Sequence, residues 1–260
     1  MISKSKQKFI RSLQLKKNRR EEGLFVAEGP KVVGDILAVN SPKMVVATAA
    51  WLSKNGCRLS PTTEVIDVND EELRQISFLQ HPQDVLAVFP IPANQSRIFD
   101  ERYLKSHLCL ALDGVQDPGN LGTIVRIADW FGIETVFCSQ ETADLWNPKV
   151  VQATMGSIAH VKVCYVDLEQ LFSTLPHDFP VYGTLLDGTD IYQQQLSNYG
   201  IIVMGNEGNG ISHAIRQHVN RMLLIPNFPK GRPAADSLNV AIATAITCAE
   251  FRRRSVQKNE

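Results

Sequence analysis

The stretch IIVMGNEGNGIS, residues 201–212, decides which fold this chain can adopt. Its first half is a run of apolar and β-branched residues, which is typical of a buried strand, and its second half holds three glycines and a glutamate. Because glycine has no Cβ atom, a strand that runs into such a loop lets the backbone come close to a ligand. The stretch therefore predicts a ligand-binding turn at the end of a strand.

Two common nucleotide-binding turns do not fit this loop. Its glycines follow the spacing Gly-x-x-Gly-x-Gly, whereas a dinucleotide-binding turn has Gly-x-Gly-x-x-Gly directly after the first strand of its domain. A phosphate-binding loop of the form Gly-x-x-x-x-Gly-Lys-Ser/Thr occurs nowhere in the chain. These differences argue against a nicotinamide-dependent oxidoreductase and against a P-loop enzyme.

Two other stretches have the same character, because each begins as a strand and continues into a loop rich in Gly, Asn or Pro. They are LALDGVQDPGNLGTIVRIADWFGI at 110–133 and LLIPNFPKGRPAADSLNVAIATAI at 223–246. The carboxyl ends of parallel strands meet at one edge of a sheet, where ligands usually bind. We therefore expect the three loops to form one site that offers amides, a serine, an arginine and a carboxylate rather than a metal cage.

The remainder of the chain predicts two domains. Residues 107–260 alternate strand-like and helix-like segments, the pattern of a mostly parallel sheet covered on both faces. Residues 1–97 form a smaller α/β unit that begins with a basic helix over 3–20. The polar, proline-bearing segment PIPANQSRIFDERYLKS at 90–106 predicts a boundary near residue 97, with residues 98–106 as the linker.

The composition is that of a globular protein with a real core. Of 260 residues, 44% are hydrophobic and 21% charged, and no apolar run reaches the length of a membrane span. The five cysteines are scattered without a Cys-x-x-Cys pair, and the six histidines show no ligand spacing, so we expect no metal and a cytoplasmic location.

The net charge is zero, but the bases are clustered. Residues 1–20 hold eight Lys or Arg and no acid, and Arg252, Arg253 and Arg254 form a second group. Such clusters are either the solvent-exposed faces of helices or a basic surface that binds nucleic acid.

The three loop-bearing stretches together resemble the signature motifs of the SpoU (TrmH-type) RNA 2′-O-ribose methyltransferases, within the SPOUT superfamily. The resemblance covers about 107–254, in motif order and spacing. LFVAEGPKVVGDIL, within the first ninety residues, is similar to the ribosomal-protein-like substrate-binding domain that many members carry. The resemblance implies an α/β domain with a trefoil knot whose backbone binds S-adenosyl-L-methionine, and a homodimer in which the arginine of one protomer faces the cofactor of the other.

The resemblance also implies roles for particular residues. Arg126 would be the central catalytic group, and because a guanidinium keeps its proton we expect it to stabilise charge or clamp a phosphate. Asn120 would orient the substrate or Arg126, or simply cap a helix, and Glu207 would hydrogen-bond across the site or lie exposed in a turn. The remaining candidates are Ser237 and Asn239 for the reacting nucleotide or for helix capping, and Met204, Gly205, Ile225 and Leu238 for the cofactor.

RNA contacts are expected from basic residues in two places. They are Lys8, Arg11, Lys16 and Lys17 in the N-terminal segment, and Lys230 and Arg232 in a third-motif loop that is longer than usual. A weaker candidate is Asn147. The resemblance favours ribosomal RNA over transfer RNA, and a catalytically silent RNA-binding module is the alternative from another class. The target nucleotide and its base are not encoded in any of these motifs.

Overall fold

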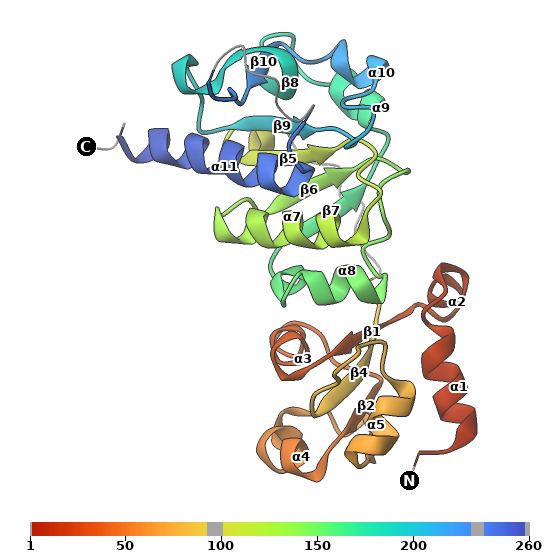
Figure 1. Ribbon diagram of the computed structural model, residues 1–260. Helices are drawn as coiled ribbons and strands as arrows, with labels where there is room; N and C mark the ends of the chain where they lie inside the picture. Colours follow the sequence, from red (N-terminus) through yellow and green to blue (C-terminus); the bar gives the residue numbers. More distant parts are fainter. Residues whose placement is uncertain (1, 93–100, 230–236, 258–260) are drawn as a thin grey trace. The chain divides into compact units, whose positions relative to one another are not determined.

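The computed structural model describes residues 2–92, 101–229 and 237–257, and they fall into two compact units (Figure 1). The first unit comprises Met1–Ala93 together with Asp144–His160, and the second comprises Asn94–Ala143 and Val161–Glu260. No helix among the described residues is long and apolar enough to span a membrane.

The first unit is built on a four-stranded sheet of order β1-β4-β2-β3. Strands β2 and β3 are parallel, and the other neighbours are antiparallel. The strands are β1 (Leu24–Glu28), β2 (Met44–Ala47), β3 (Glu64–Asp67) and β4 (Val85–Pro90). The α-helices are α1 (Lys4–Ser12), α2 (Lys16–Glu22), α3 (Pro30–Ile36), α4 (Ala49–Asn55), α5 (Asp70–Ile76) and α8 (Pro148–Ala153).

Helices cover both faces of this sheet, because the pleat turns alternate residues of β1 to opposite sides. Leu24 and Val26 pack in one apolar cluster with residues of α1 and α5. Phe25 and Ala27 pack in the other with residues of α3, α4 and α8. The expected single helix over 3–20 is in fact two helices, since the buried Leu13 turns the chain into the core between them.

Residues Asp144–His160 complete the first unit, although our sequence analysis assigned them to the second domain. Trp146 packs on Phe25 with ring centroids 4.4 Å apart, and Val151 lies in the same apolar cluster. Arg19, which is 2% exposed, forms an ion pair with Asp144. An isolated N-terminal fragment would therefore lack part of its own core.

The second unit holds a six-stranded sheet of order β10-β8-β9-β5-β6-β7, in which every neighbouring pair is parallel. The strands are β5 (Leu108–Leu112), β6 (Thr135–Cys138), β7 (Lys162–Tyr165), β8 (Val181–Asp190), β9 (Gly200–Met204) and β10 (Arg221–Leu224). The α-helices are α6 (Glu101–Leu104), α7 (Pro118–Trp130), α9 (Leu168–Ser173), α10 (His213–Arg216) and α11 (Val240–Gln257).

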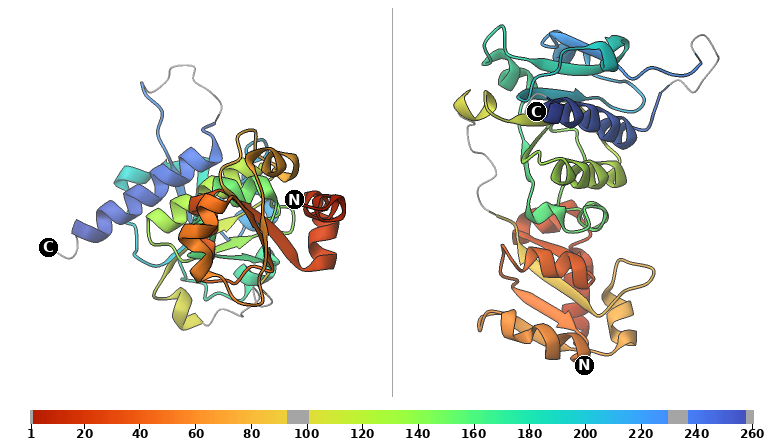
Figure 2. Two further views of the ribbon diagram at one scale, coloured as in Figure 1. Left: turned by 90° about the horizontal axis from the view of Figure 1, so that it is seen from below. Right: turned by 90° about the vertical axis from the view of Figure 1, so that its left-hand side faces the viewer.

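Helices lie on both faces of this sheet, so β5 and β9 are buried on both sides and read as continuous apolar runs. Helices α7 and α11 pack together along one face, while α9 and α10 lie on the other (Figures 1 and 2). Because the strands are parallel, the loops after β5, β9 and β10 meet at one edge. This arrangement confirms the predicted parallel α/β architecture.

Candidate active site

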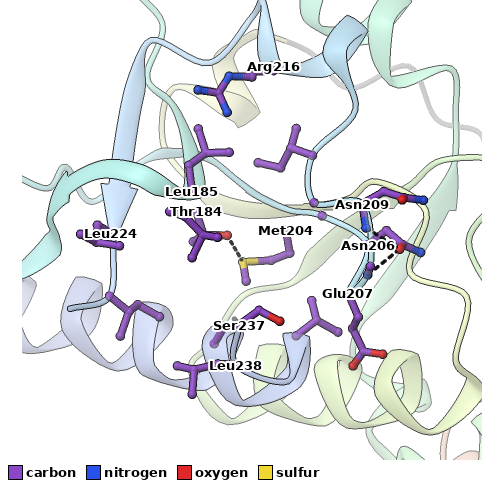
Figure 3. Close-up of a pocket in the computed structure, with 18 of the residues that line it drawn as sticks. Thr184, Leu185, Met204, Asn206, Glu207, Asn209, Arg216, Leu224, Ser237 and Leu238 are labelled. Atoms are coloured by element: carbon purple, nitrogen blue, oxygen red, sulfur yellow. Dashed lines mark hydrogen bonds between the residues drawn. The ribbon is translucent and has the colours of Figure 1, made fainter. Parts of the chain in front are cut away.

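A cavity of about 460 Å³ opens at the carboxyl edge of the second sheet (Figure 3). Its walls come from Thr184–Asp187 in β8, from Met204–Ile211 at the end of β9 and in the loop after it, and from residues on either side of the loop between β10 and α11. The four residues that we expected at a cofactor, Met204, Gly205, Ile225 and Leu238, all line it.

The glycine loop after β9 closes on itself around Asn206. The Asn206 carbonyl and amide exchange hydrogen bonds with Gly210 at 2.8 and 2.9 Å, and the Asn206 side chain donates to the Gly114 carbonyl at 2.8 Å. A Cβ atom on Gly205 would lie 2.2 Å from the carbonyl carbon of Gly210. Glycine is thus required at 205 by the chain's own backbone, whereas the sequence had suggested approach to a ligand as the reason.

The middle of the cavity is apolar. Met204 is buried, and the Thr184 hydroxyl contacts its sulfur at 3.5 Å (Figure 3). Leu185, Leu224 and Leu238 add aliphatic walls. Such a surface suits a flat, weakly polar ring system.

Three polar side chains from the three predicted motifs meet beside the cavity. The Glu207 carboxylate oxygen Oε1 accepts hydrogen bonds from the Asn120 amide at 2.6 Å and from the Asn239 amide at 2.7 Å. The Asn239 amide also donates to Asn120 Oδ1 at 2.9 Å. The structure therefore brings together three of the five predicted catalytic residues. Both alternatives for Glu207 hold, because its side chain is exposed in a turn and also accepts hydrogen bonds across the site.

Of the two predicted catalytic asparagines that could cap a helix, Asn120 and Asn239, only Asn239 does so. Asp117, not Asn120, caps α7, because the Asp117 carboxylate accepts the Asn120 backbone N–H at 2.8 Å. Asn239 does cap α11, since its Oδ1 accepts the backbone N–H groups of Ala241 and Ile242 at 3.0 and 3.3 Å. The side-chain oxygen of Asn239 therefore caps α11, while its side-chain amide donates hydrogen bonds to Glu207 and Asn120.

The other two predicted catalytic residues are placed differently. Ser237 lines the cavity, and its hydroxyl makes no hydrogen bond to another described residue. Arg126 is exposed on α7 and does not line the cavity; within the described ranges its guanidinium has neither an ion pair nor a hydrogen bond. Within the described residues, a structural salt bridge therefore does not account for Arg126.

Arg126 belongs to an exposed stripe of α7. Gly119, Thr123, Arg126 and Trp130 follow the helical spacing of four, three and four residues, and Trp130 is 84% exposed. On the neighbouring α11, Ile242 is 53% exposed. This face combines an unpaired cation with large apolar side chains.

Asp187 and Arg216 form an ion pair at the cavity wall, which the sequence analysis missed. The hydrogen bond from Arg216 lowers the pKa of Asp187. Strand β8 loses its regular pairing here, because Met222 pairs with Gly183 but the next residue of β10 pairs with Thr189. The only sequence signal was a strand that turns polar at Asp187, near the carboxyl edge.

The predicted basic residues are only partly available to RNA. Lys8, Arg11, Lys16 and Lys17 are all exposed, whereas Lys230 and Arg232 lie outside the described residues. The three C-terminal arginines instead interact with other residues of the second unit. Arg252 donates to the carbonyls of Phe131 and Gly132 at 2.6 and 2.9 Å, and Arg253 and Arg254 pair with the buried Glu250 at 2.7 Å, which lowers the pKa of Glu250.

Comparison with known proteins shows the family. Residues 107–249 match the SpoU rRNA Methylase family, and residues 4–87 match the MRM3-like substrate binding domain. The chain belongs to the SpoU rRNA methylase family. This finding confirms the resemblance predicted from the three motifs, and with it the predicted class of S-adenosylmethionine-dependent RNA methyltransferase.

Similar proteins cover nearly the whole chain. The 23S rRNA (guanosine(2553)-2′-O)-methyltransferase RlmP of Bacillus subtilis is 31% identical, with 91% of each chain covered. A TrmH-family structure from Porphyromonas gingivalis is 41% identical, with a TM-score of 0.85 over 98% of this chain and 99% of that one. An AdoMet-bound rRNA methyltransferase from Sinorhizobium meliloti is 31% identical, with a TM-score of 0.82 over 98% and 97%.

The hydrogen bonds of Glu207 lead to a first prediction. Glu207→Ala leaves two amides without their acceptor, and hydrogen bonds to a charged group contribute about 1.5–3 kcal/mol each, so we expect at least a tenfold loss of methyl transfer. Glu207→Gln retains an oxygen at the same place and should lose much less. Steady-state rates of both variants test this, and equal losses would show that the carboxylate charge matters rather than its hydrogen bonds.

Proposed function

We propose that this protein transfers the methyl group of S-adenosylmethionine to a ribose 2′-hydroxyl of 23S ribosomal RNA. The observation that carries the proposal is a cavity lined by the second and third motifs, with the Asn120–Glu207–Asn239 network beside it linking the first motif to the other two. The names of the similar bacterial proteins support 23S rRNA as the substrate and a 2′-oxygen as the acceptor.

The residues of the cavity fit the cofactor. Its aliphatic middle, at Leu185, Met204 and Leu238, matches an adenine ring, and its polar groups at Ser237 and Asp187 match a ribose and an amino-acid end. When bound, the cofactor supplies a methyl group on an activated sulfonium. The glycine loop and β8 would hold it in place, and alignment of the reacting atoms alone contributes roughly 7–11 kcal/mol in favourable cases.

Arg126 is the group that we assign to the substrate oxygen or its flanking phosphate. Its guanidinium is exposed and is unpaired within the described part of the chain. A positively charged group next to the 2′-oxygen stabilises the negative charge that develops on that oxygen as its proton leaves. Asn120, held by Glu207 and Asn239, would position the nucleotide.

A homodimer would explain why Arg126 lies away from the cavity of its own chain. The exposed stripe of α7, with Trp130, and the exposed Ile242 of α11 supply an apolar surface that a second copy would cover. The cation on that surface would then meet the partner's cofactor. We expect sedimentation at micromolar concentration to give a dimer, and a species that is monomeric and fully active would rule out a shared site.

The exposed bases of α1 and α2 would bind the RNA backbone. We expect the combined change of Lys8, Arg11, Lys16 and Lys17 to Gln to weaken RNA binding strongly. The slope of log affinity against log salt should fall by up to about 3, since each single-strand phosphate contact contributes about 0.7. Cofactor affinity should be unchanged, and an unaltered salt slope would place the RNA elsewhere.

Charge replacement tests this surface better than deletion of residues 1–95. Because Trp146 and Val151 pack in the first unit, a deletion would strip them of their neighbours and leave apolar surface exposed. Loss of RNA binding would then not report on the bases alone.

A trefoil knot and a cytoplasmic location complete the proposal. The family resemblance supports the knot. Mapping 2′-O-methylated positions in rRNA from a deletion strain tests the function. A single position that loses its methyl group identifies the target, and an unchanged rRNA with a changed transfer RNA would redirect the proposal to transfer RNA.

A further inference from the structure

A second cavity lies within the first unit and shares no residue with the active site. It has a volume of about 280 Å³, and its walls come from β1, from the turn after α5 and from α8. Pockets for drug-sized ligands measure roughly 300–1,000 Å³, so this cavity suits a single flat ring system.

A buried carboxylate lies in the wall of this cavity. Glu28 is 5% exposed and accepts hydrogen bonds from the Ser77 hydroxyl and, at 2.8 Å, from the Phe78 backbone N–H. No cation in the described part of the chain pairs with it. Burial raises the pKa of Glu28, and the two hydrogen bonds oppose that rise. Since each carboxylate oxygen can accept further bonds, N–H donors of a ligand would stabilise the ionised form.

Two polar side chains of α8 line the same cavity. The half-buried Gln152 carboxamide and the exposed Lys149 ammonium each lack a hydrogen bond or ion pair to any described residue. The start of α8 is itself held in place, because Asn147 accepts the backbone N–H of Lys149 at 2.9 Å. The Gln152 carboxamide, inside the cavity, can form hydrogen bonds with the edge of a ring. The Lys149 ammonium, at the surface, can pair with an anion beside that ring.

The rest of the wall is apolar and adjoins the basic helix α1. Phe78 supplies an aromatic ring, and Val26 and Pro148 supply aliphatic surface. The Arg11 guanidinium donates to the carbonyl of Gln75 at 2.8 Å, three residues before Phe78. The proposed phosphate-binding surface therefore reaches the turn that forms this cavity.

We propose that this cavity binds one unpaired nucleobase of the RNA substrate, with its N–H donors toward Glu28, its face against Phe78 and its flanking phosphate at Lys149. Sequence-selective proteins hold splayed-out RNA bases in this way, by stacking and by hydrogen bonds to the base edge. The inference rests on the proposed RNA substrate and adds a base contact to the phosphate contacts of α1 and α2.

The test is equilibrium binding of a fluorescent ten-nucleotide oligoadenylate to the full-length protein over a range of salt. We expect Gln152→Leu and Phe78→Leu each to weaken binding at least fivefold, the lower end of the effect of losing a stacked base. Neither should alter the salt slope. Lys149→Ala should lower the slope by about 0.7. Lys54→Ala, an exposed lysine at the end of α4, is the matched control and should stay within twofold.

Two results would overturn the proposal. One is wild-type affinity for both leucine variants with an unchanged melting temperature. The other is a salt slope that falls in the leucine variants as it does in Lys149→Ala, which would mean phosphate binding only. Methyl transfer by the same wild-type preparation is measured separately: no transfer to rRNA would refute the proposed function, while transfer with unaffected leucine variants would refute only the nucleobase site.

Discussion

Replacement of Arg126 by alanine is expected to lower the rate of methyl transfer by at least about 10²-fold, the loss typical of removing one charge-stabilising donor from an active site. Cofactor affinity should change little, because Arg126 does not line the cavity of its own chain and we assign it to the substrate oxygen or its flanking phosphate, on the substrate side of a shared site. The melting temperature should also hold, since the side chain is exposed and makes no bond to another described residue. Rate, cofactor affinity and melting, measured on one preparation, test all three expectations.

Two further variants sharpen this test. Arg126→Lys keeps the positive charge but loses the planar guanidinium that can donate two parallel hydrogen bonds. Partial activity of this variant would indicate that the charge alone stabilises the transition state. No activity would indicate that a bidentate contact with a phosphate is needed. Arg74→Ala removes an exposed helical arginine of the first unit and should retain the wild-type rate. An Arg126→Ala protein that melts normally and methylates at the wild-type rate would refute the catalytic role.

Gly205→Ala is expected to abolish cofactor binding, with at least a hundredfold loss of affinity. The added Cβ would lie 2.2 Å from the Gly210 carbonyl carbon and 2.3 Å from the Ile211 nitrogen, and backbone at such distances must move. All three residues line the cavity, so the movement alters the cavity itself. Calorimetric titration with S-adenosylmethionine measures the effect.

Gly208→Ala is the matched control in the same loop. The nearest atom to its added Cβ would be Asn206 Oδ1 at 3.5 Å, which is ordinary contact. We expect near wild-type cofactor affinity from this variant. Equal losses at 205 and 208 would mean that the loop needs general flexibility, and our account of Gly205 would be wrong.

Much of the fold could be predicted because its strands are strongly patterned. Strands β5 and β9 are buried on both faces and therefore appear as continuous apolar runs, and the turns that follow them are marked by Gly, Asn and Pro. The meeting of Asn120, Glu207 and Asn239 followed from the rule that parallel strands end at one edge.

The missed features depend on contacts between residues far apart in the chain. Nothing local distinguishes Asp144–His160 from the second domain; its place is set by Trp146 against Phe25 and by Asp144 with Arg19. The C-terminal arginines formed a basic cluster in the sequence, but the carbonyls and the carboxylate that engage them come from tertiary packing. Gly205 was placed at the cavity for a reason that only the closed loop reveals.

The most direct test of the central claim is methyl transfer to RNA with the product identified. Full-length protein is incubated with isotopically labelled S-adenosylmethionine and ribosomal RNA from a strain that lacks the gene, and the RNA is digested to nucleosides for mass spectrometry. Our account predicts one labelled 2′-O-methylnucleoside from 23S rRNA, and no label with Arg126→Ala. Label on a base, or no transfer by a folded protein that binds the cofactor, would contradict it.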